Sequence, residues 1–376
     1  MRKLLLLALS LLPASARAQS ADPLAPLLAF ARQQPNDIAV FTAAVRPDGT
    51  PDPAKPVLSW NAAQPMPLAS TRKIVVLAAY ARAVAAGKLD PQTPVKLAEW
   101  EAYYLPGLDG GAHPASLEAL KIPADAQGRA QDGRRTVPLD TVARFMVETS
   151  DNAATDLLLT RLGQGAIPDT LRALGLTGQE NFGPISGLFN AWDDPALRAT
   201  YAAQPLAQRV ADSWTRAARV SQTPALRDPD ALSRNAPPLD VQARQADTTD
   251  TRGTVNDYAG LLARVLTGAG LGKTELEVMR RHLGWPMRVN PGNAQAFTQA
   301  YAKGGSLSGV LTDNFAFQPK VGPRKGENLV VSVFLRRIPE GQYAALQENL
   351  ETAMLYLAIL PEQAQRLVDV LKASRK

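Results

Sequence analysis

The chain has 376 residues, which is enough for one large domain or two packed ones with a substantial core. Its formal charge is +6, but three of the positive charges lie in the first 18 residues, and the remaining charge gives no reason to expect a nucleic-acid partner. The chain has no cysteine and two histidines, which excludes a cysteine nucleophile and a disulfide framework and argues against a histidine-rich zinc site.

The N-terminus has the pattern of a secretory signal. Arg2 and Lys3 precede the apolar run 4–12, and Ala16-Arg17-Ala18 is a small-x-small cleavage sequence. The apolar run is too short to cross a membrane. We therefore predict a signal peptide over residues 1–18 and a secreted, periplasmic protein with no membrane span.

Strand and helix signals alternate at the start of the mature chain. Helices are predicted over residues 23–32 and 74–85, the second ended by Gly87, and strands over 37–45 and 57–60. Residues 89–271 lack convincing strand signals; their clearest helical patterns cover 139–148, 152–162 and 254–266. Two stretches there, near 107–135 and 192–250, have the character of insertions, and the second includes a helix over 197–219.

Strand signals return in the last third of the chain. After a helix over residues 273–283, strands are predicted over 297–303, 309–317 and 328–336, followed by helices over 340–359 and 361–373. The sequence therefore predicts an α/β fold in which residues 22–88 and 272–376 form an antiparallel sheet flanked by helices. Residues 89–271 form an inserted all-helical domain.

A serine and a lysine at the start of the second helix form a candidate nucleophile and base. Ser70 and Lys73 are three residues apart, so both lie on one face of a helix. A buried lysine with a lowered pKa can accept the serine proton. By comparison, His113 and His282 have no recognisable catalytic setting, so surface or packing roles are predicted for both.

Two further segments follow in order. Ser150-Asp151-Asn152 lies between two predicted helices, and Lys303-Gly304-Gly305-Ser306 ends a predicted strand. With Ser70-Thr71-Arg72-Lys73, these segments resemble the Ser-x-x-Lys, Ser-Asp-Asn and Lys-Thr-Gly motifs of the penicillin-recognising serine hydrolases, specifically class A β-lactamases. The resemblance extends from the first strand to the C-terminal helix and implies a β-lactamase/transpeptidase-like fold.

The resemblance implies roles for individual residues. Ser70 attacks an amide carbonyl to give an acyl-enzyme, Lys73 takes its proton directly or through a water, and Ser150 relays a proton to the leaving nitrogen. Four residues are assigned to substrate binding: Asn152, Lys303, Ser306 (through its backbone N–H) and Tyr104, which resembles the aromatic wall of the site entrance. Core packing is the alternative role for Tyr104. No cofactor or metal is implied.

Two positions depart from the family pattern. The middle threonine of Lys-Thr-Gly is Gly304, which removes a hydroxyl that Ser306 or Ser308 can supply instead. The family's loop glutamate, which activates the deacylating water and lies four residues before an asparagine, is matched by Ser186, four residues before Asn190. Ser186 cannot act as that base, and Glu180, Asp193 and Asp194 are poorly placed by pattern. Acylation is therefore predicted to be intact and deacylation slow.

Three functions remain open on these grounds. The leading one is an exported β-lactamase-like serine hydrolase, a monomer acting on small-molecule β-lactams or related amides. The first alternative is a penicillin-binding D-alanyl-D-alanine peptidase acting on cell-wall peptides. The second is a non-catalytic sensor of β-lactams or cell-wall fragments, which the complete set of Ser70, Lys73, Ser150 and Lys303 argues against.

Overall fold

The computed structural model describes residues 22–197 and 200–375, so the predicted signal peptide lies outside the described residues. The chain forms two compact units. The sheet unit holds residues 22–71, 252–271 and 283–375. The helical unit holds Arg72–Thr251 and Gly272–His282. This grouping assigns residues 72–88 and 272–282 to the helical unit, whereas the sequence placed them in the sheet domain. It also assigns residues 252–271 to the sheet unit, whereas the sequence placed them in the helical domain.

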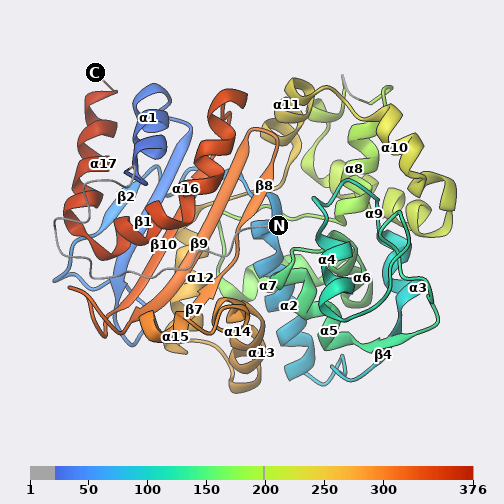
Figure 1. Ribbon diagram of the computed structural model, residues 1–376, viewed down its shortest axis with the longest axis horizontal. Coiled ribbons are helices and arrows are strands. Elements are labelled where there is room, and N and C mark those ends of the chain that lie inside the picture. The colour runs from blue at the N-terminus through green and yellow to red at the C-terminus, as the bar shows by residue number, and fades with distance from the viewer. Residues whose placement is uncertain (1–21, 198–199, 376) are drawn as a thin grey trace. The chain divides into compact units, whose positions relative to one another are not determined.

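The sheet unit is built around one antiparallel sheet with the strand order β2-β1-β10-β9-β7 and with β8 paired to β9 (Figure 1). Its strands are β1 (Ile38–Val45), β2 (Leu58–Trp60), β7 (Phe297–Ala302), β8 (Gly305–Leu307), β9 (Val310–Pro319) and β10 (Asn328–Leu335). Its helices are α1 (Ala25–Gln33), α12 (Val255–Thr267), α14 (Trp285–Val289), α15 (Asn293–Ala296), α16 (Glu340–Ile359) and α17 (Pro361–Ala373). The predicted sheet from both chain ends is confirmed.

The two faces of this sheet have different partners because successive side chains of a strand point to opposite sides. Leu329, Val331 and Val333 of β10 belong to the apolar core that α1, α16 and α17 complete. Phe334 points the other way, and its ring lies 5.8 Å from that of Tyr258 on α12. Helices therefore cover the sheet on both faces.

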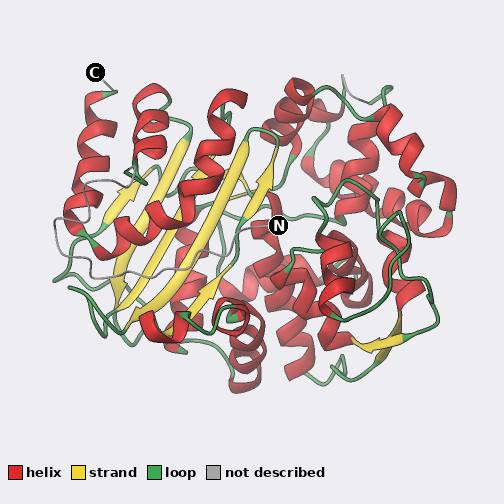
Figure 2. Cartoon of the chain, in the orientation of Figure 1, coloured by secondary structure: helices red, strands yellow, loops and turns green. Residues whose placement is uncertain are grey.

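The helical unit has few strands (Figure 2). Its helices are α2 (Lys73–Ala85), α3 (Leu97–Trp100), α4 (Ala112–Ala119), α5 (Leu139–Glu148), α6 (Asn152–Leu162), α7 (Ala166–Leu174), α8 (Ile185–Asp193), α9 (Leu206–Gln222), α10 (Pro229–Asn235), α11 (Leu239–Thr249) and most of α13 (Lys273–Leu283). The short strands β4 (Pro94–Lys96) and β5 (Thr136–Pro138) pair with each other. The pair β3 (Met66–Pro67) and β6 (Arg252–Gly253) belongs to the sheet unit.

Most predicted elements are confirmed. Helices α5, α6, α16 and α17 have the predicted bounds, whereas α9 begins at Leu206 rather than at residue 197. The three short strands β4, β5 and β6 are absent from the prediction for residues 89–271. Within the described ranges, no helix is both long enough and apolar enough to cross a membrane.

Candidate active site

The turn that carries Ser70 is fixed to the sheet by its neighbour Thr71. Residues Ala69–Arg72 form a 3₁₀ turn that runs directly into α2. The Thr71 and Thr312 hydroxyls lie 2.9 Å apart, and Asn314 Nδ2 donates to Thr71 Oγ1 at 3.1 Å. Thr312 also donates to the Leu68 carbonyl at 2.9 Å. These buried bonds from β9 hold the backbone on both sides of Ser70, whose own side chain is half-buried.

The two glycines after Lys303 are required by close approaches within the sheet unit. A Cβ on Gly305 would lie 2.5 Å from the Ser70 backbone nitrogen, so only glycine fits there without displacing the turn. A Cβ on Gly304 would lie 2.8 Å from Asp313 Oδ1. A side chain at Gly304 therefore requires the Asp313 carboxylate to move, which agrees with the first departure from the motif.

Lys303 itself is buried at the end of β7. Its Nζ donates to the Gly304 carbonyl at 2.6 Å, and its own carbonyl accepts from Asn314 Nδ2 at 3.1 Å. Ser306 is half-buried on β8 and pairs with Leu311, and Ser308 is also half-buried. Lys303, directly after β7, and Ser306, on β8, therefore both lie beside β9, the strand that also holds the Ser70 turn.

In the helical unit, the structure brings Lys73 together with Ser150 and Asn152. Lys73 is the first residue of α2, and its Nζ donates to the Ser150 carbonyl at 2.6 Å and to Asn152 Oδ1 at 2.7 Å. It also lies 3.2 Å from Ser150 Oγ. Ser150 adopts the left-handed φ of 70°, uncommon for a residue with a side chain, and this bend directs both its carbonyl and its hydroxyl at the amine.

The environment of Lys73 favours the neutral amine. Complete burial, opposed by the carboxylates of Asp151, Asp109 and Asp156 and aided by the neighbouring Arg72, lowers the pKa of Lys73 to about 7. Near neutral pH a large share of the amine is therefore unprotonated and able to accept a proton.

Asp151 connects this cluster to a buried histidine. Its Oδ1 accepts from Ala154 N at 2.9 Å and so caps α6. Its Oδ2 lies 2.8 Å from His113 Nδ1, and His113 Nε2 lies 3.3 Å from Glu101 Oε1. Both His113 and Asp151 are fully enclosed. Asp151 therefore fixes the segment that presents Ser150 and Asn152, and His113 fixes Asp151.

The charges in this group stabilise one another. Burial opposes protonation of His113, but the Asp151 and Glu101 carboxylates outweigh it and raise the pKa of His113 to about 9. Burial likewise opposes ionisation of Asp151, but the bonded His113 and the Ala154 N–H lower its pKa. His113 is thus a buried imidazolium between two carboxylates. Of the surface and packing roles predicted for the two histidines, burial supports packing for His113 and also for His282, which lies beside Asp140.

Ser186 lies at the start of α8 against a second buried carboxylate. Asp156 accepts from Ile185 N at 2.6 Å and from Ser186 N at 2.7 Å. The Ser186 hydroxyl is enclosed without a well-formed hydrogen bond. Burial raises the pKa of Asp156 to about 6, although the N–H groups of α8 act in the opposite direction. The Asp156 carboxylate thus accepts from the backbone of α8. Ser186, the residue that the sequence pattern aligns with the family's glutamate, has no carboxylate to act as a base.

A small cavity borders Ser186 within the helical unit. Its volume is about 10 Å³, room for about one water molecule, and its polar wall includes Asp109, Asn152 and Ser186. Tyr104 also borders it, with a buried ring 4.5 Å from that of His113 and a hydroxyl that donates to the Gln127 carbonyl at 3.3 Å. This packing fits the core role considered for Tyr104.

The sequence missed several residues that build this site. Thr312, Asn314 and Asp313 act through contacts with the Ser70 turn and Gly304, and Asp156 acts through α8. Nothing in the local pattern around these residues differs from an ordinary strand or helix. Asp109 was the easiest of these residues to find from the sequence, because it precedes the turn signal Gly110-Gly111. It accepts a hydrogen bond from His113 N at 2.7 Å.

The antiparallel sheet with helices on both faces, the helical unit and the motif residues define a serine hydrolase of the β-lactamase/transpeptidase-like fold. The family described as the β-lactamase enzyme family matches residues 31–345, and the chain belongs to this family. A search of curated protein sequences gives no match.

Solved structures with this fold are similar at low identity. A β-lactamase from Sphaerobacter thermophilus is 19% identical with a TM-score of 0.52, covering 88% of this chain and 95% of that chain. The TLA-1 extended-spectrum β-lactamase is 13% identical with a TM-score of 0.51, covering 88% and 98%. A leucine-to-glutamate mutant of PBP-A, described as an acyl-enzyme complex with penicillin G, is 15% identical with a TM-score of 0.50, covering 88% and 94%. These likenesses support the fold alone.

Proposed function

We propose that this protein is an exported, monomeric serine hydrolase that forms an acyl-serine intermediate with β-lactams or related amides and releases it slowly. The observation that carries the proposal is the Lys73 amine, which is buried, has a pKa of about 7 and is bonded to Ser150 and Asn152. A general base is most effective when its pKa lies near the working pH. Lys73 meets that condition three residues after the proposed nucleophile.

The proposed acylation transfers one proton in two steps. Ser70 Oγ forms a bond to the carbonyl carbon as its proton passes to Lys73. The C–N bond then breaks, and Ser150 delivers a proton to the departing nitrogen while Lys73 replenishes Ser150. Lys303 provides positive charge for a substrate carboxylate, Asn152 binds a substrate amide, and the backbone N–H groups of Ser70 and Ser306 bind the oxyanion. Such a donor is typically worth about 3 kcal/mol.

A penicillin-binding D-alanyl-D-alanine peptidase is the second candidate, and the α8 start is the observation that favours it. Ser186 stands where the family's glutamate is expected, and the nearby Asp156 carboxylate is bonded to two backbone N–H groups. Release of D-alanine from a D-alanyl-D-alanine peptide, compared with loss of penicillin, separates the two candidates.

The direct test of acylation is intact-protein mass spectrometry of the mature chain with penicillin G. We expect a mass increase of one penicillin, mapped to the peptide that contains Ser70 and absent from Ser70→Ala. Thr71 is the neighbouring hydroxyl, so a fragment spectrum that separates the two residues identifies the nucleophile. An unmodified wild-type protein would overturn the proposal and would favour the sensor alternative. An adduct that survives in Ser70→Ala would also overturn it, because another residue would then be the nucleophile.

A further inference from the structure

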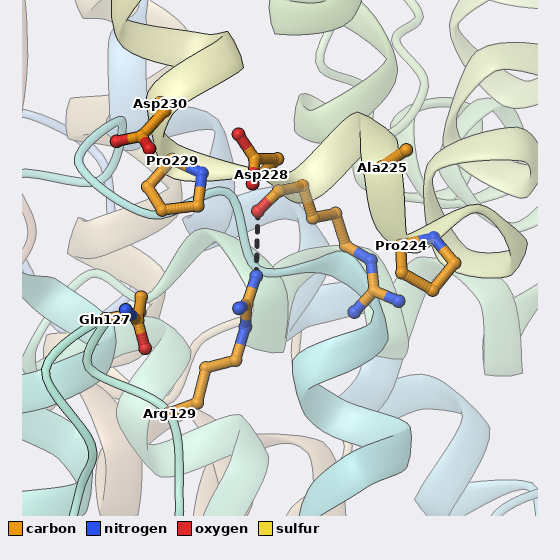
Figure 3. A pocket seen from close by; sticks show the side chains of 8 residues that line it. Gln127, Arg129, Pro224, Ala225, Asp228, Pro229 and Asp230 are labelled. Carbon is orange, nitrogen blue, oxygen red and sulfur yellow. Dashed lines mark hydrogen bonds between the residues drawn. The ribbon is translucent and has the colours of Figure 1, made fainter.

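A second cavity lies within the helical unit, in the stretches that the sequence marked as insertions. Its volume is about 590 Å³, within the range of small-molecule sites. Gln127 and Arg129 line it from the first stretch, and the segment from Pro224 to Asp230 lines it from the second (Figure 3). A small apolar cluster also joins the two stretches: Val220 and Leu232 of the second pack with Leu105, and Leu108 of the first packs against this cluster. The cavity is therefore a built feature of the two stretches together.

Two arginines face this cavity without a carboxylate partner. Arg129 Nη2 donates to the Arg227 carbonyl at 2.8 Å, the bond drawn in Figure 3, and Arg227 Nη1 donates to the Glu101 carbonyl at 3.1 Å. Both side chains are partly buried, and each Nε is enclosed with no hydrogen-bond partner. Among the described residues, no carboxylate lies within ion-pair distance of either guanidinium. Partly buried cations are normally paired, so this arrangement lacks an anion.

The electrostatics agree with that geometry. Burial lowers the pKa of Arg227 and the positive charge of Arg129 lowers it further, against the more weakly acting Glu101. Two guanidiniums that repel each other in a partly dry wall are stabilised by an oxyanion that accepts from both.

The same cavity also has an acidic edge. Asp228 and Asp230 are exposed, and Asp228 Oδ1 accepts from Ala231 N at 2.8 Å as the cap of α10. Neither carboxylate neutralises the arginines. They would repel a simple anion and attract a neighbouring ammonium group. A ligand with both charges fits this wall better than phosphate or acetate alone.

We propose that this cavity binds a small zwitterion, an amino acid or the free end of a short peptide, with its carboxylate on Arg129 and Arg227 and its ammonium toward Asp228 and Asp230. The proposal does not depend on the chemistry proposed for Ser70. It assigns to the two inserted stretches a binding role that the motif residues do not have.

The test is a calorimetric titration at pH 7 with three dipeptide probes: glycylglycine, its N-acetyl derivative and its C-terminal amide. We expect glycylglycine to bind most tightly, the amide at least about tenfold more weakly and the acetylated probe several-fold more weakly, since charge-assisted bonds are lost in each case. The double variant Arg129→Gln/Arg227→Gln should bind all three probes equally weakly. Arg134→Gln, at an exposed arginine of the same stretch, is the matched control and should bind like wild type.

Two further variants check that the probes bind in this cavity and not at the motif residues. Asp230→Asn changes an exposed side chain, so it should fold normally; it should weaken glycylglycine binding and leave the acetylated probe unaffected. Lys303→Ala should retain wild-type affinity. Loss of affinity in Lys303→Ala would place the peptide at the motif residues and overturn the proposal. Equal affinity for the three probes, or tighter binding of inorganic phosphate than of glycylglycine, would also overturn it.

Discussion

The first turns of helices α6 and α8 are each held by a buried carboxylate that accepts from the helix backbone. The pKa of the carboxylate at α6 is lowered, whereas the pKa of the carboxylate at α8 is raised. At α6, Asp151 caps the helix and is paired with His113, so its pKa is lowered. At α8, Asp156 accepts from two N–H groups but has no ion-pair partner among the described residues, and burial raises its pKa to about 6. The first carboxylate stays charged over the whole neutral range and fixes the Lys73 partners, whereas the second takes up a proton just below neutral pH and holds α8.

This difference between the α6 and α8 carboxylates bears on the two steps of the proposed reaction, acylation and deacylation. The α6 side holds the residues that we propose to serve the serine nucleophile, and Lys73 Nζ lies 2.6–3.2 Å from oxygens of Ser150 and Asn152. The α8 side has a serine in place of a base and a carboxylate already committed to backbone N–H groups. The comparison predicts an enzyme whose first step is tuned for neutral pH and whose second step is impaired.

The largest expected effect is removal of the base. In Lys73→Met, the rate constant for formation of the penicilloyl adduct should fall by about 10³-fold, in the middle of the range for general-base catalysis. Lys88→Met, at an exposed lysine beyond the end of α2, is the matched control and should acylate at the wild-type rate. Quenched-flow mixing followed by mass spectrometry measures both rate constants. A Lys73→Met rate constant within threefold of wild type would contradict the role of Lys73 as the base of acylation.

The pH dependence of the same rate constant follows from the lowered pKa of Lys73. Because only the neutral amine accepts a proton, the acylation rate should fall about tenfold per pH unit below about pH 7 and level off above it. A rate that continues to rise up to pH 10 would show that Lys73 remains protonated at neutral pH.

The next effect concerns stability at His113. Its pKa is raised to about 9 in the folded protein from 6.5, so the protonated ring stabilises the fold fully below pH 6.5, and this contribution is lost as pH rises through about 9. The shift corresponds to about 3 kcal/mol of unfolding free energy. His113→Gln should lack that decline in urea titrations between pH 6 and 9.5. Parallel wild-type and variant curves over this range would mean that His113 is neutral.

Asp156 should show a pH dependence of the same sign as His113, but at lower pH, because its pKa is also raised in the folded protein. Its folded pKa of about 6 exceeds the ordinary value of 3.8, so the contribution of the neutral acid is complete below pH 3.8 and is lost as pH rises through about 6. We expect Asp156→Asn to remove this loss, also about 3 kcal/mol or somewhat less, in melting curves recorded from pH 4 to 7. An unchanged slope in the variant would contradict the assignment.

The smallest expected gain is at Ser186. Ser186→Glu supplies a carboxylate at the matched family position, next to the small cavity bordered by Asn152 and Asp109, and should accelerate loss of the adduct by about tenfold, below the usual range for a positioned base. Ser186→Gln, which has the same size without the charge, is the matched control. An equal rate in both variants would show that the loop is placed differently from the family's.

Most of the fold could be predicted from the sequence because the residues that begin and end its helices lie next to them in the chain. Pro138, the Ser-Asp pair before Asn152, Pro339 and Pro361 lie next to helix starts that the structure reproduces to the residue. The β4 and β5 ladder was missed because three-residue strands that begin or end in proline are specified by their partner rather than by their own pattern.

The residues of the candidate site likewise fall into those that a local sequence pattern predicts and those that depend on contacts between distant segments. Ser70, Lys73, Ser150 and Lys303 could be found from motif spacing. The enclosure of His113 between Glu101 and Asp151 depends on side chains from separate segments meeting in space, as does the contact that leaves no room for a side chain at Gly304. No spacing along the chain encodes those contacts.

The lifetime of the wild-type penicilloyl adduct tests the central claim most directly. Excess penicillin G is removed once acylation is complete, and the adduct mass is followed over time at pH 7. We predict that acylation is much faster than loss of the adduct and that little free penicillin is hydrolysed while the adduct persists. An adduct that disappears as fast as it forms, with sustained consumption of penicillin, would contradict the account and would require a deacylating base elsewhere in the site.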